Sequence, residues 1–164
     1  MAHFQQELPT DILKDFDFLQ KNAIEIFGGM TRAGAKVVKE QIATNAGRVF
    51  NPKTAAKLNK RLKITRTYET PSDGGINTKV AYYGYIPREN GKPFKIKGGT
   101  YKGVPAPLLA ALREFGASGK GEMPAELRRY WTKAPFVRPA FDNKGAIEKA
   151  MLRAQKELSG GLLE

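Results

Sequence analysis

The segment Ala134–Phe141, with the sequence APFVRPAF, constrains the fold more than any other stretch of this chain. Each of its prolines lacks an N–H and fixes its own φ, so the segment cannot lie in the middle of a sheet. We therefore expect an extended strap laid over the core, with Phe136 and Arg138 pointing to one side and Val137 to the other. The strap is predicted to end where the last helix begins.

Helical patterns dominate the N-terminal third of the chain. Thr10 is the predicted N-cap of a first helix, along which apolar residues recur at helical spacing. Gly28-Gly29 is predicted to end this helix. Asn51-Pro52 predicts the cap and first turn of another helix. The three helices expected in this part cover residues 11–27, 31–46 and 52–60.

A strand pattern replaces the helical one after about residue 62. The runs 64–68 and 79–85 are rich in β-branched and aromatic residues, and turn residues separate them. This order is typical of an antiparallel hairpin. Alternation along the second run places Tyr83 and Tyr85 on the face opposite Tyr82. Such a strand is explained by burial or subunit contact, or by stacking of exposed tyrosines on nucleic-acid bases.

Residues 87–104 are predicted to be a long basic excursion with one short strand at 94–96. The Gly, Lys and Pro content of this stretch indicates that it cannot bury enough apolar area to order alone. We therefore expect it to be poorly ordered in the free protein and to become fixed on assembly.

The C-terminal third is again mainly helical. A short amphipathic helix is expected over 107–115, a helical turn over 124–131 and an amphipathic helix over 143–158. The predicted fold class is α+β: N-terminal helices, a small antiparallel β-sheet with a long loop, and a C-terminal amphipathic helix. We expect one domain over 1–164, with 1–61 mainly helical, 62–103 a β-hairpin and long loop, and 104–164 mainly helical.

The composition argues against an enzyme. The chain of 164 residues has no cysteine, and its single histidine stands at position 3. The carboxylates form no acid–base pair, and no metal-ligand spacing or phosphate loop accompanies them. We expect no catalytic, metal or cofactor site. No secretory signal or membrane span is visible, so synthesis in a cytoplasm without membrane contact is expected.

The net charge of +12 points to an anionic partner or to an assembly in which acidic and basic faces meet. Residues 1–30 hold five acidic and two basic residues, whereas 31–66 hold ten basic residues and one acidic residue. Two rows of basic residues share helical faces and are candidates for DNA or subunit contact, the alternative being a solvated surface. The rows are Arg32, Lys36 and Lys39, then Lys53, Lys57 and Lys60.

Two short motifs carry a resemblance to a known family. The first is Glu114-Phe115-Gly116, and the second is Pro135-Phe136-Val137-Arg138-Pro139-Ala140-Phe141, which leads into the last helix. In this arrangement, with helices, a basic segment and a hairpin upstream, the chain resembles the tail-completion and head–tail joining proteins of long-tailed bacteriophages. Relatives of minor tail protein Z belong to that group.

The resemblance implies a structural virion protein of the phage neck, made in the host bacterial cytoplasm. It implies a ring of six copies, with twelve as the alternative, between the connector and the tail tube, and contact with tail-terminator proteins and with genomic DNA in the channel. It also makes the motif fold-critical or interfacial, with the Arg138 guanidinium expected to pair with Glu114. The residues concerned are Glu114, Phe115, Gly116, Pro135, Phe136, Arg138, Pro139 and Phe141.

A second interpretation belongs to a different class. The two basic rows within 31–61 and the tyrosine-rich strand are also what a stand-alone double-stranded DNA-binding protein requires. The dependence of duplex binding on salt separates the two interpretations.

Overall fold

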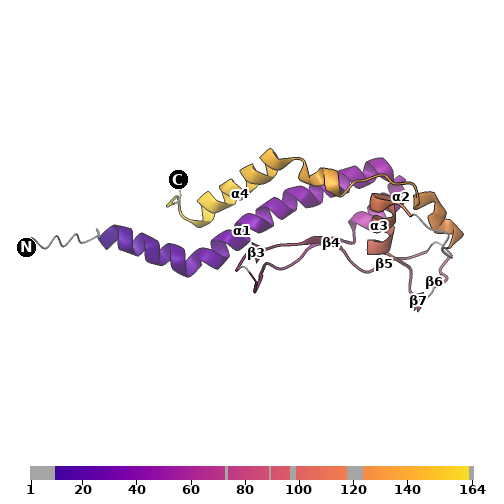
Figure 1. Cartoon of the computed structure of the whole chain (residues 1–164), viewed down its shortest axis with the longest axis horizontal. Helices are drawn as coiled ribbons and strands as arrows, with labels where there is room; N and C mark the ends of the chain where they lie inside the picture. The colour runs from indigo at the N-terminus through magenta and orange to yellow at the C-terminus, as the bar shows by residue number, and fades with distance from the viewer. Residues whose placement is uncertain (1–9, 73, 89, 97–98, 118–123, 163–164) are drawn as a thin grey trace, which may run out of the picture.

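The computed structural model describes residues 10–72, 74–88, 90–96, 99–117 and 124–162, and His3 lies outside them. The fold is α+β, as predicted: a long N-terminal helix, small antiparallel pairs of strands and a C-terminal helix. The molecule is elongated, and one end of the long helix projects beyond the other elements (Figure 1). Among the described helices, none has a stretch long and apolar enough to cross a bilayer.

The first helix is longer than predicted. Helix α1 runs without a break from Thr10 to Val49, about 60 Å at 1.5 Å per residue. The expected helix end at Gly28-Gly29 and the separate helix over 31–46 are therefore wrong. Figure 1 shows that α1 instead bends between its projecting end and the part that packs on α4.

Close packing explains why glycine occupies these positions inside a helix. A Cβ on Gly28 would lie 3.1 Å from Cγ2 of Thr67, and one on Gly29 would collide with Cδ1 of Leu158. A Cβ on Gly34 would lie 3.0 Å from Cγ of Met151. The glycines thus let the strand region and the last helix approach the α1 backbone.

The second helix follows its prediction. Helix α2 spans Pro52–Asn59, and the side chain of its N-cap Asn51 accepts a hydrogen bond of 2.8 Å from the N–H of Thr54. The proline stands in the first turn, where a missing N–H costs nothing. The helix ends at the C-cap residue Lys60, whose N–H donates the last helical hydrogen bond, to the carbonyl of Ala56.

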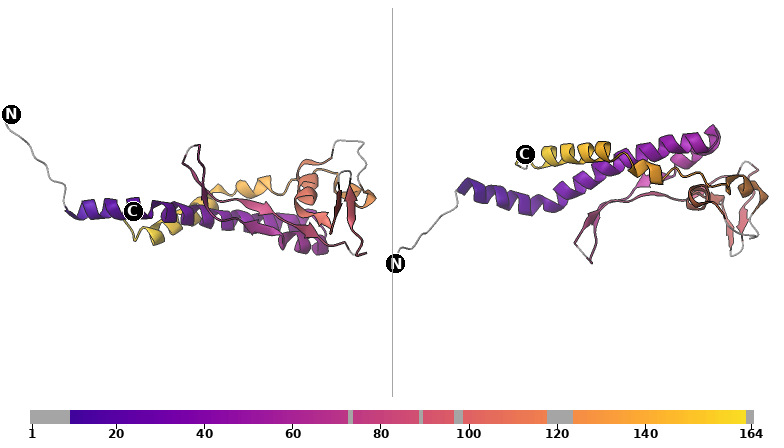
Figure 2. Two further views of the ribbon diagram at one scale, coloured as in Figure 1. Left: turned by 90° about the horizontal axis from the view of Figure 1, so that it is seen from below. Right: turned by 45° about the horizontal axis from the view of Figure 1, so that its top comes forward.

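The predicted hairpin is present as two successive pairs of strands. β1 (Leu62–Ile64) pairs antiparallel with β4 (Val80–Tyr82), and β2 (Tyr68–Glu69) pairs with β3 (Ile76–Asn77). Tyr82 is buried, whereas Tyr83 and Tyr85 are exposed, as predicted. The strand is nevertheless interrupted at Gly84, whose φ is 72°, so strand alternation does not continue from Tyr82 to Tyr85. Figure 2 shows this hairpin extending along α1 and away from it at the turn.

The excursion over 87–104 has more structure than expected. β5 (Tyr85–Ile86) pairs with β8 (Val104–Pro105), and between them β6 (Phe94–Ile96) pairs with β7 (Gly99–Tyr101). The short strand predicted at 94–96 is confirmed. Phe94 is 0% exposed and belongs to the core, so this stretch buries more apolar area than the sequence indicates. Poor order of the stretch in the free protein stays a prediction.

The C-terminal elements match the sequence pattern closely. Helix α3 spans Ala106–Phe115 and ends at Gly116, whose φ of 76° favours glycine. A 3₁₀ turn, η1, covers Ala125–Tyr130, and helix α4 covers Lys144–Leu158. Helix α4 lies against α1, with Ile147 and Met151 turned toward the surface at Gly34. The apolar face of the amphipathic helix predicted over 143–158 thus faces α1.

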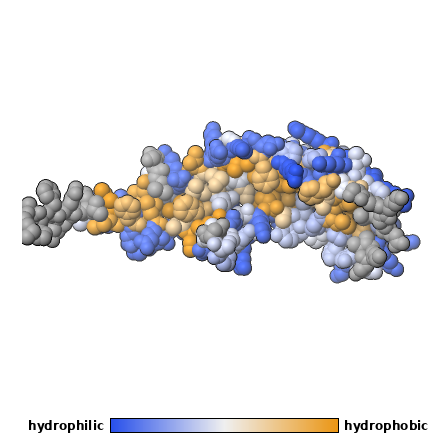
Figure 3. Space-filling view, in the orientation of Figure 1, coloured by the Kyte–Doolittle hydropathy of each residue, from blue (hydrophilic) through white to orange (hydrophobic). Residues whose placement is uncertain are grey.

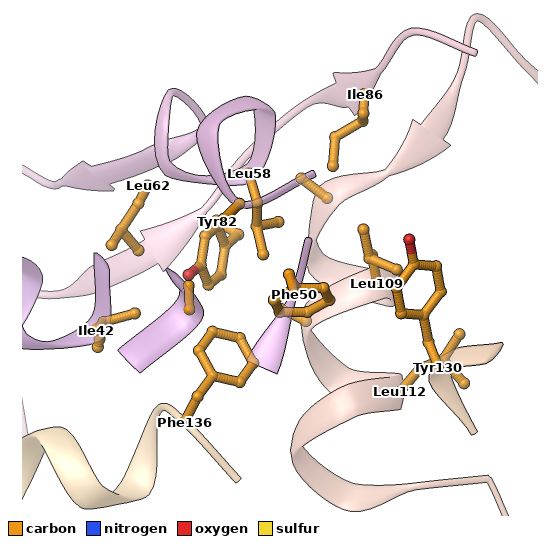
Figure 4. Close-up of a cluster of buried hydrophobic side chains, with 14 of the residues drawn as sticks. Ile42, Phe50, Leu58, Leu62, Tyr82, Ile86, Leu109, Leu112, Tyr130 and Phe136 are labelled. Carbon is orange, nitrogen blue, oxygen red and sulfur yellow. The ribbon is translucent and has the colours of Figure 1, made fainter. Parts of the chain in front are cut away.

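The strap departs from the predicted extended form. It enters the αR region at Val137 and continues as a 3₁₀ turn, η2, over Arg138–Phe141. Phe136 is therefore buried while Arg138 is exposed, so the expectation that both point to one side is wrong. Figure 4 shows the Phe136 ring directed into the core beside Phe50 and Tyr82. Its centroid lies 5.3 Å and 6.2 Å from theirs.

We predict that replacing Gly34 with leucine lowers the free energy of unfolding by about 1–3 kcal/mol, because the new side chain has to displace Met151 and Ile147 of α4. Gly47→Leu is the matched control. A Cβ there meets nothing within 4 Å, so the better helix propensity of leucine makes this change neutral or stabilising. Urea unfolding followed by circular dichroism measures both, and equal effects at the two sites would contradict the proposed close packing of α4.

Candidate functional site

The two sequence motifs meet at the carboxylate of Glu114. This side chain comes from the last turn of α3 and is only 4% exposed. One carboxylate oxygen accepts the N–H groups of Phe136 and Val137, each at 2.8 Å, and the other accepts the N–H of Arg138 at 3.0 Å. A single acidic side chain thus satisfies three successive backbone donors of the strap, at the point where it turns into η2.

The pairing between Glu114 and Arg138 exists in a form that the sequence did not predict. The backbone N–H of Arg138 reaches Glu114, whereas its guanidinium lies over the ring of Phe115, 5.9 Å from the centroid. The predicted hydrogen bond from the guanidinium is therefore wrong. The 3₁₀ turn explains the difference, because it directs the N–H groups inward and leaves the Arg138 side chain at the exposed surface.

The three donors also decide the ionisation of Glu114. Burial raises the pKa of a carboxyl group, but the N–H groups of Val137, Phe136 and Arg138 and the positive charge of Arg138 outweigh burial. The net effect holds the pKa of Glu114 below its ordinary value. The charged carboxylate is therefore the form that the folded chain stabilises.

Tyr82 lies in the same region and shows the opposite response. Burial, and then the negative charge of Glu114, raise the pKa of Tyr82 above its ordinary value. The two pKa shifts are coupled, because the Glu114 charge that the N–H groups stabilise is the charge that disfavours ionisation of Tyr82. Tyr82 is neutral at physiological pH, and this region of the core therefore carries a single negative charge.

Further contacts tie the strap to both neighbouring elements. Asn45 of α1 is buried and donates a hydrogen bond of 3.1 Å from Nδ2 to the carbonyl of Phe136. The N–H of Ala134 donates to the carbonyl of Arg113 at 2.8 Å. Sequence reasoning missed Asn45, although an amide on the apolar face between Ile42 and Ala46 was a signal that could have found it.

The remaining motif residues fall into two groups. Gly116 is required by backbone geometry, since a Cβ there would lie 3.1 Å from the carbonyl oxygen of Trp131. Four others lie at the surface: Phe115, Pro135, Pro139 and Phe141. Phe115 and Phe141 are 63% and 54% exposed, so these two aromatic side chains are available for contact with other molecules.

The basic rows lie on the surface of α1 and α2. Arg32, Lys36, Lys53 and Lys60 are exposed, and Lys39 and Lys57 are half-buried. Exposed cations in such rows are compatible with contact to DNA phosphates or to acidic side chains of a protein. Their role stays a prediction.

An unexpected apolar surface covers the projecting end of α1, residues 10–27, which we call the arm. Its apolar positions follow the predicted helical spacing, but no other described element covers most of them. Figure 3 shows apolar side chains over much of this end of the molecule. The large apolar residues of the arm that are exposed are Ile12, Leu13, Phe16, Phe18, Ile24 and Phe27. Apolar area gathered in this way marks an interaction surface.

Comparison with known protein families, with curated proteins and with solved structures finds no match to this chain. The functional argument therefore depends on the motif geometry and on the exposed surfaces. Within the described residues, no group of three or more His, Cys, Asp or Glu side chains is placed to hold a metal ion.

We predict that Glu114→Gln lowers the free energy of unfolding by about 2–4 kcal/mol, because three N–H groups then lose a charged acceptor. Arg138→Ala is the matched comparison. It keeps the backbone N–H and removes the contact with Phe115 and an exposed positive charge near Glu114, so it should cost about 1 kcal/mol or less. Denaturant unfolding of both variants measures this, and a larger loss for Arg138→Ala would contradict the assigned bonding.

Acid should remove the contribution of Glu114. Its pKa is lower in the folded chain than in the unfolded chain, so the unfolded state binds the proton more readily. The stabilisation is present above the unfolded pKa of about 4.5 and is lost as pH falls through the folded pKa. The difference in unfolding free energy between wild type and Glu114→Gln should therefore shrink between about pH 7 and pH 3. A difference independent of pH would count against an ionised Glu114.

Proposed function

We propose that this protein is a structural component of the neck of a long-tailed bacteriophage. In this proposal, copies made in the host cytoplasm assemble into a ring between the connector and the tail tube, complete the tail and join it to the head. The ring has six copies, or twelve, and tail-terminator proteins are further neighbours. The protein carries out no catalysis and needs no cofactor.

The exposed apolar arm of α1 is the observation that carries the proposal. An amphipathic helical segment of this length gains most of its stability from tertiary packing, yet the described part of the chain leaves six large apolar residues of the arm exposed. Such a subunit is suited to a permanent assembly in which another molecule covers the arm. Enzymes and small DNA-binding proteins do not require such a surface.

The motif geometry gives separate support. Residues 114 and 136–138 are far apart in sequence, and they are joined through one buried carboxylate. The resemblance to the bacteriophage family rests on these two motifs together, and their contact gives that pairing a physical reason. A fixed strap also presents Phe141 at the surface beside α4.

Charge asymmetry favours contact between unlike surfaces. The first 30 residues carry a net negative charge and the rest of the chain carries the whole positive excess. Unlike faces on one subunit favour head-to-tail contacts, which close into a ring when the rotation allows it. Exposed ion pairs contribute only about 0–1 kcal/mol each, so apolar contacts have to supply most of the adhesion.

We predict that the purified protein forms closed rings and that antibodies to it label the head–tail junction of tailed particles that carry its gene. Native mass spectrometry gives the copy number, and immunogold electron microscopy gives the location. A duplex DNA titration over a range of salt concentrations tests the stand-alone DNA-binding alternative. A protein that stays monomeric and binds duplex DNA tightly, with affinity falling steeply with salt, would overturn the neck proposal.

A further inference from the structure

A shallow apolar groove lies on α1 next to the arm. It has a volume of about 240 Å³ and is bordered by α1, by the segment that runs from β3 to β4 and by the η2–α4 segment. Ala35 and Val38 form part of its floor, and Ile147, Met151 and Phe141 line one side. None of the described residues that line it is charged. The groove is therefore suited to an apolar side chain.

The arm and the groove occupy one continuous face of α1. Leu13, Phe16, Ile24 and Phe27 of the arm share a helical face with Gly34 and Val38 in the groove, because their spacings follow the helical repeat. At residues 31–38 the β3-to-β4 segment and the η2–α4 segment flank this face of α1. Along the arm no other described element covers it, and its large apolar side chains are exposed. One chain thus carries both an apolar ridge and a groove bordered by apolar side chains.

Charge selects a second copy of this chain as the occupant and disfavours pairing of two arms. The arm has four acidic and two basic residues, and Lys14 and Lys21 each pair with an aspartate of the same helix. Two arms side by side would bring acidic helices together. The body of the chain is strongly basic, and the exposed Lys79 stands between two residues of the groove wall. An acidic arm is attracted to such a body.

The sizes of the two surfaces are compatible. The arm is about 27 Å long, and large aromatic side chains bury roughly 150–250 Å² each. Phe16 is the most exposed aromatic residue of the arm, at 63%. A phenyl ring in the groove supplies part of the roughly 800 Å² per partner of a stable interface, and the other exposed apolar residues of the arm have to supply the rest against the rim.

We propose that the arm of each copy docks in the groove of a second copy, with Phe16 as the anchoring side chain. This inference rests on the self-assembly step of the proposed function, but not on the place of the protein in a virion. Arm and groove are different surfaces, so each docking event leaves one arm and one groove unused. Head-to-tail docking of this kind ends only when a ring closes.

The absence of cysteine from the chain makes disulfide trapping a direct test. Phe16→Cys protein is mixed with Phe141→Cys protein and oxidised. We expect a mixed disulfide between the two variants, because Phe141 lines the groove. Disulfides of the Phe16→Cys variant with itself would show arm–arm pairing and overturn the proposal. Phe18→Cys is the control, since a residue two positions away points to the opposite side of the helix.

A double variant distinguishes a ring from a reciprocal dimer. Oxidised Phe16→Cys/Phe141→Cys protein should give a ladder of covalent species up to the full ring on a non-reducing denaturing gel. Dimers alone would mean that two copies exchange arms, which overturns head-to-tail docking. A protein that gives no cross-links at any concentration would overturn the choice of a second copy as the occupant.

Substitution with aspartate tests the anchor without cross-linking. Phe16→Asp should weaken self-association at least tenfold, because it places a charge in an apolar groove. Phe18→Asp adds the same charge to the same helix on the opposite side and should leave association unchanged. Sedimentation velocity measures both, with circular dichroism as the check on folding. Equal effects of the two variants would overturn Phe16 as the anchor.

The outcomes separate this inference from the proposed function. The protein could form rings and be found by antibodies at tail junctions, yet give no disulfide between arm and groove. That result would overturn the docking inference and leave the neck proposal intact. Trapped rings made by a protein that is absent from tailed particles would remove the neck proposal and leave the docking mode in place.

Discussion

The bonding of the Glu114 carboxylate to three successive N–H groups is the interaction on which the rest of the core depends. The strap contains two prolines and cannot join a sheet, so its N–H groups need another acceptor inside the protein. Glu114 supplies it from the end of α3. The carboxylate thereby sets the direction in which the chain leaves the strap, and it places Phe136 between Phe50 and Tyr82. The unusual composition of APFVRPAF is explained by this role.

Two kinds of contact then organise the molecule around that core. Asn45 joins the strap to α1 through the carbonyl of Phe136, so acceptor and donor groups of the strap are both used. Along the same helix, glycines at 28, 29 and 34 allow other elements to approach the backbone. The C-terminal part of α1 is therefore surrounded, while its first 18 residues are left with an apolar face and an acidic one.

Sequence reasoning succeeded where local rules decide the structure. The Asn51-Pro52 cap, the hairpin, the strand at 94–96 and the helix end at Gly116 follow from residue types and backbone preferences within a few residues. It failed where the deciding neighbour is distant in sequence. Gly28-Gly29 has the pattern of a helix stop, but its neighbours are Thr67 and Leu158. The motif brings Glu114 and Arg138 together, but the predicted guanidinium bond is wrong, because the 3₁₀ turn directs the N–H of Arg138 to the carboxylate and its side chain to the surface. The groove, built from three separated segments, had no local signal.

The unbroken course of α1 has a mechanical consequence. Because the arm and the packed half belong to one hydrogen-bonded helix, the arm cannot swing as a tethered peptide would. Any molecule held by the arm takes an orientation relative to the core that is set by the bend in the helix. In a closed set of copies, that angle would determine the curvature, and with it the width of the central opening. Small changes in the bend of the helix, which joins the arm to the groove-bearing part, would then alter the diameter of the whole assembly.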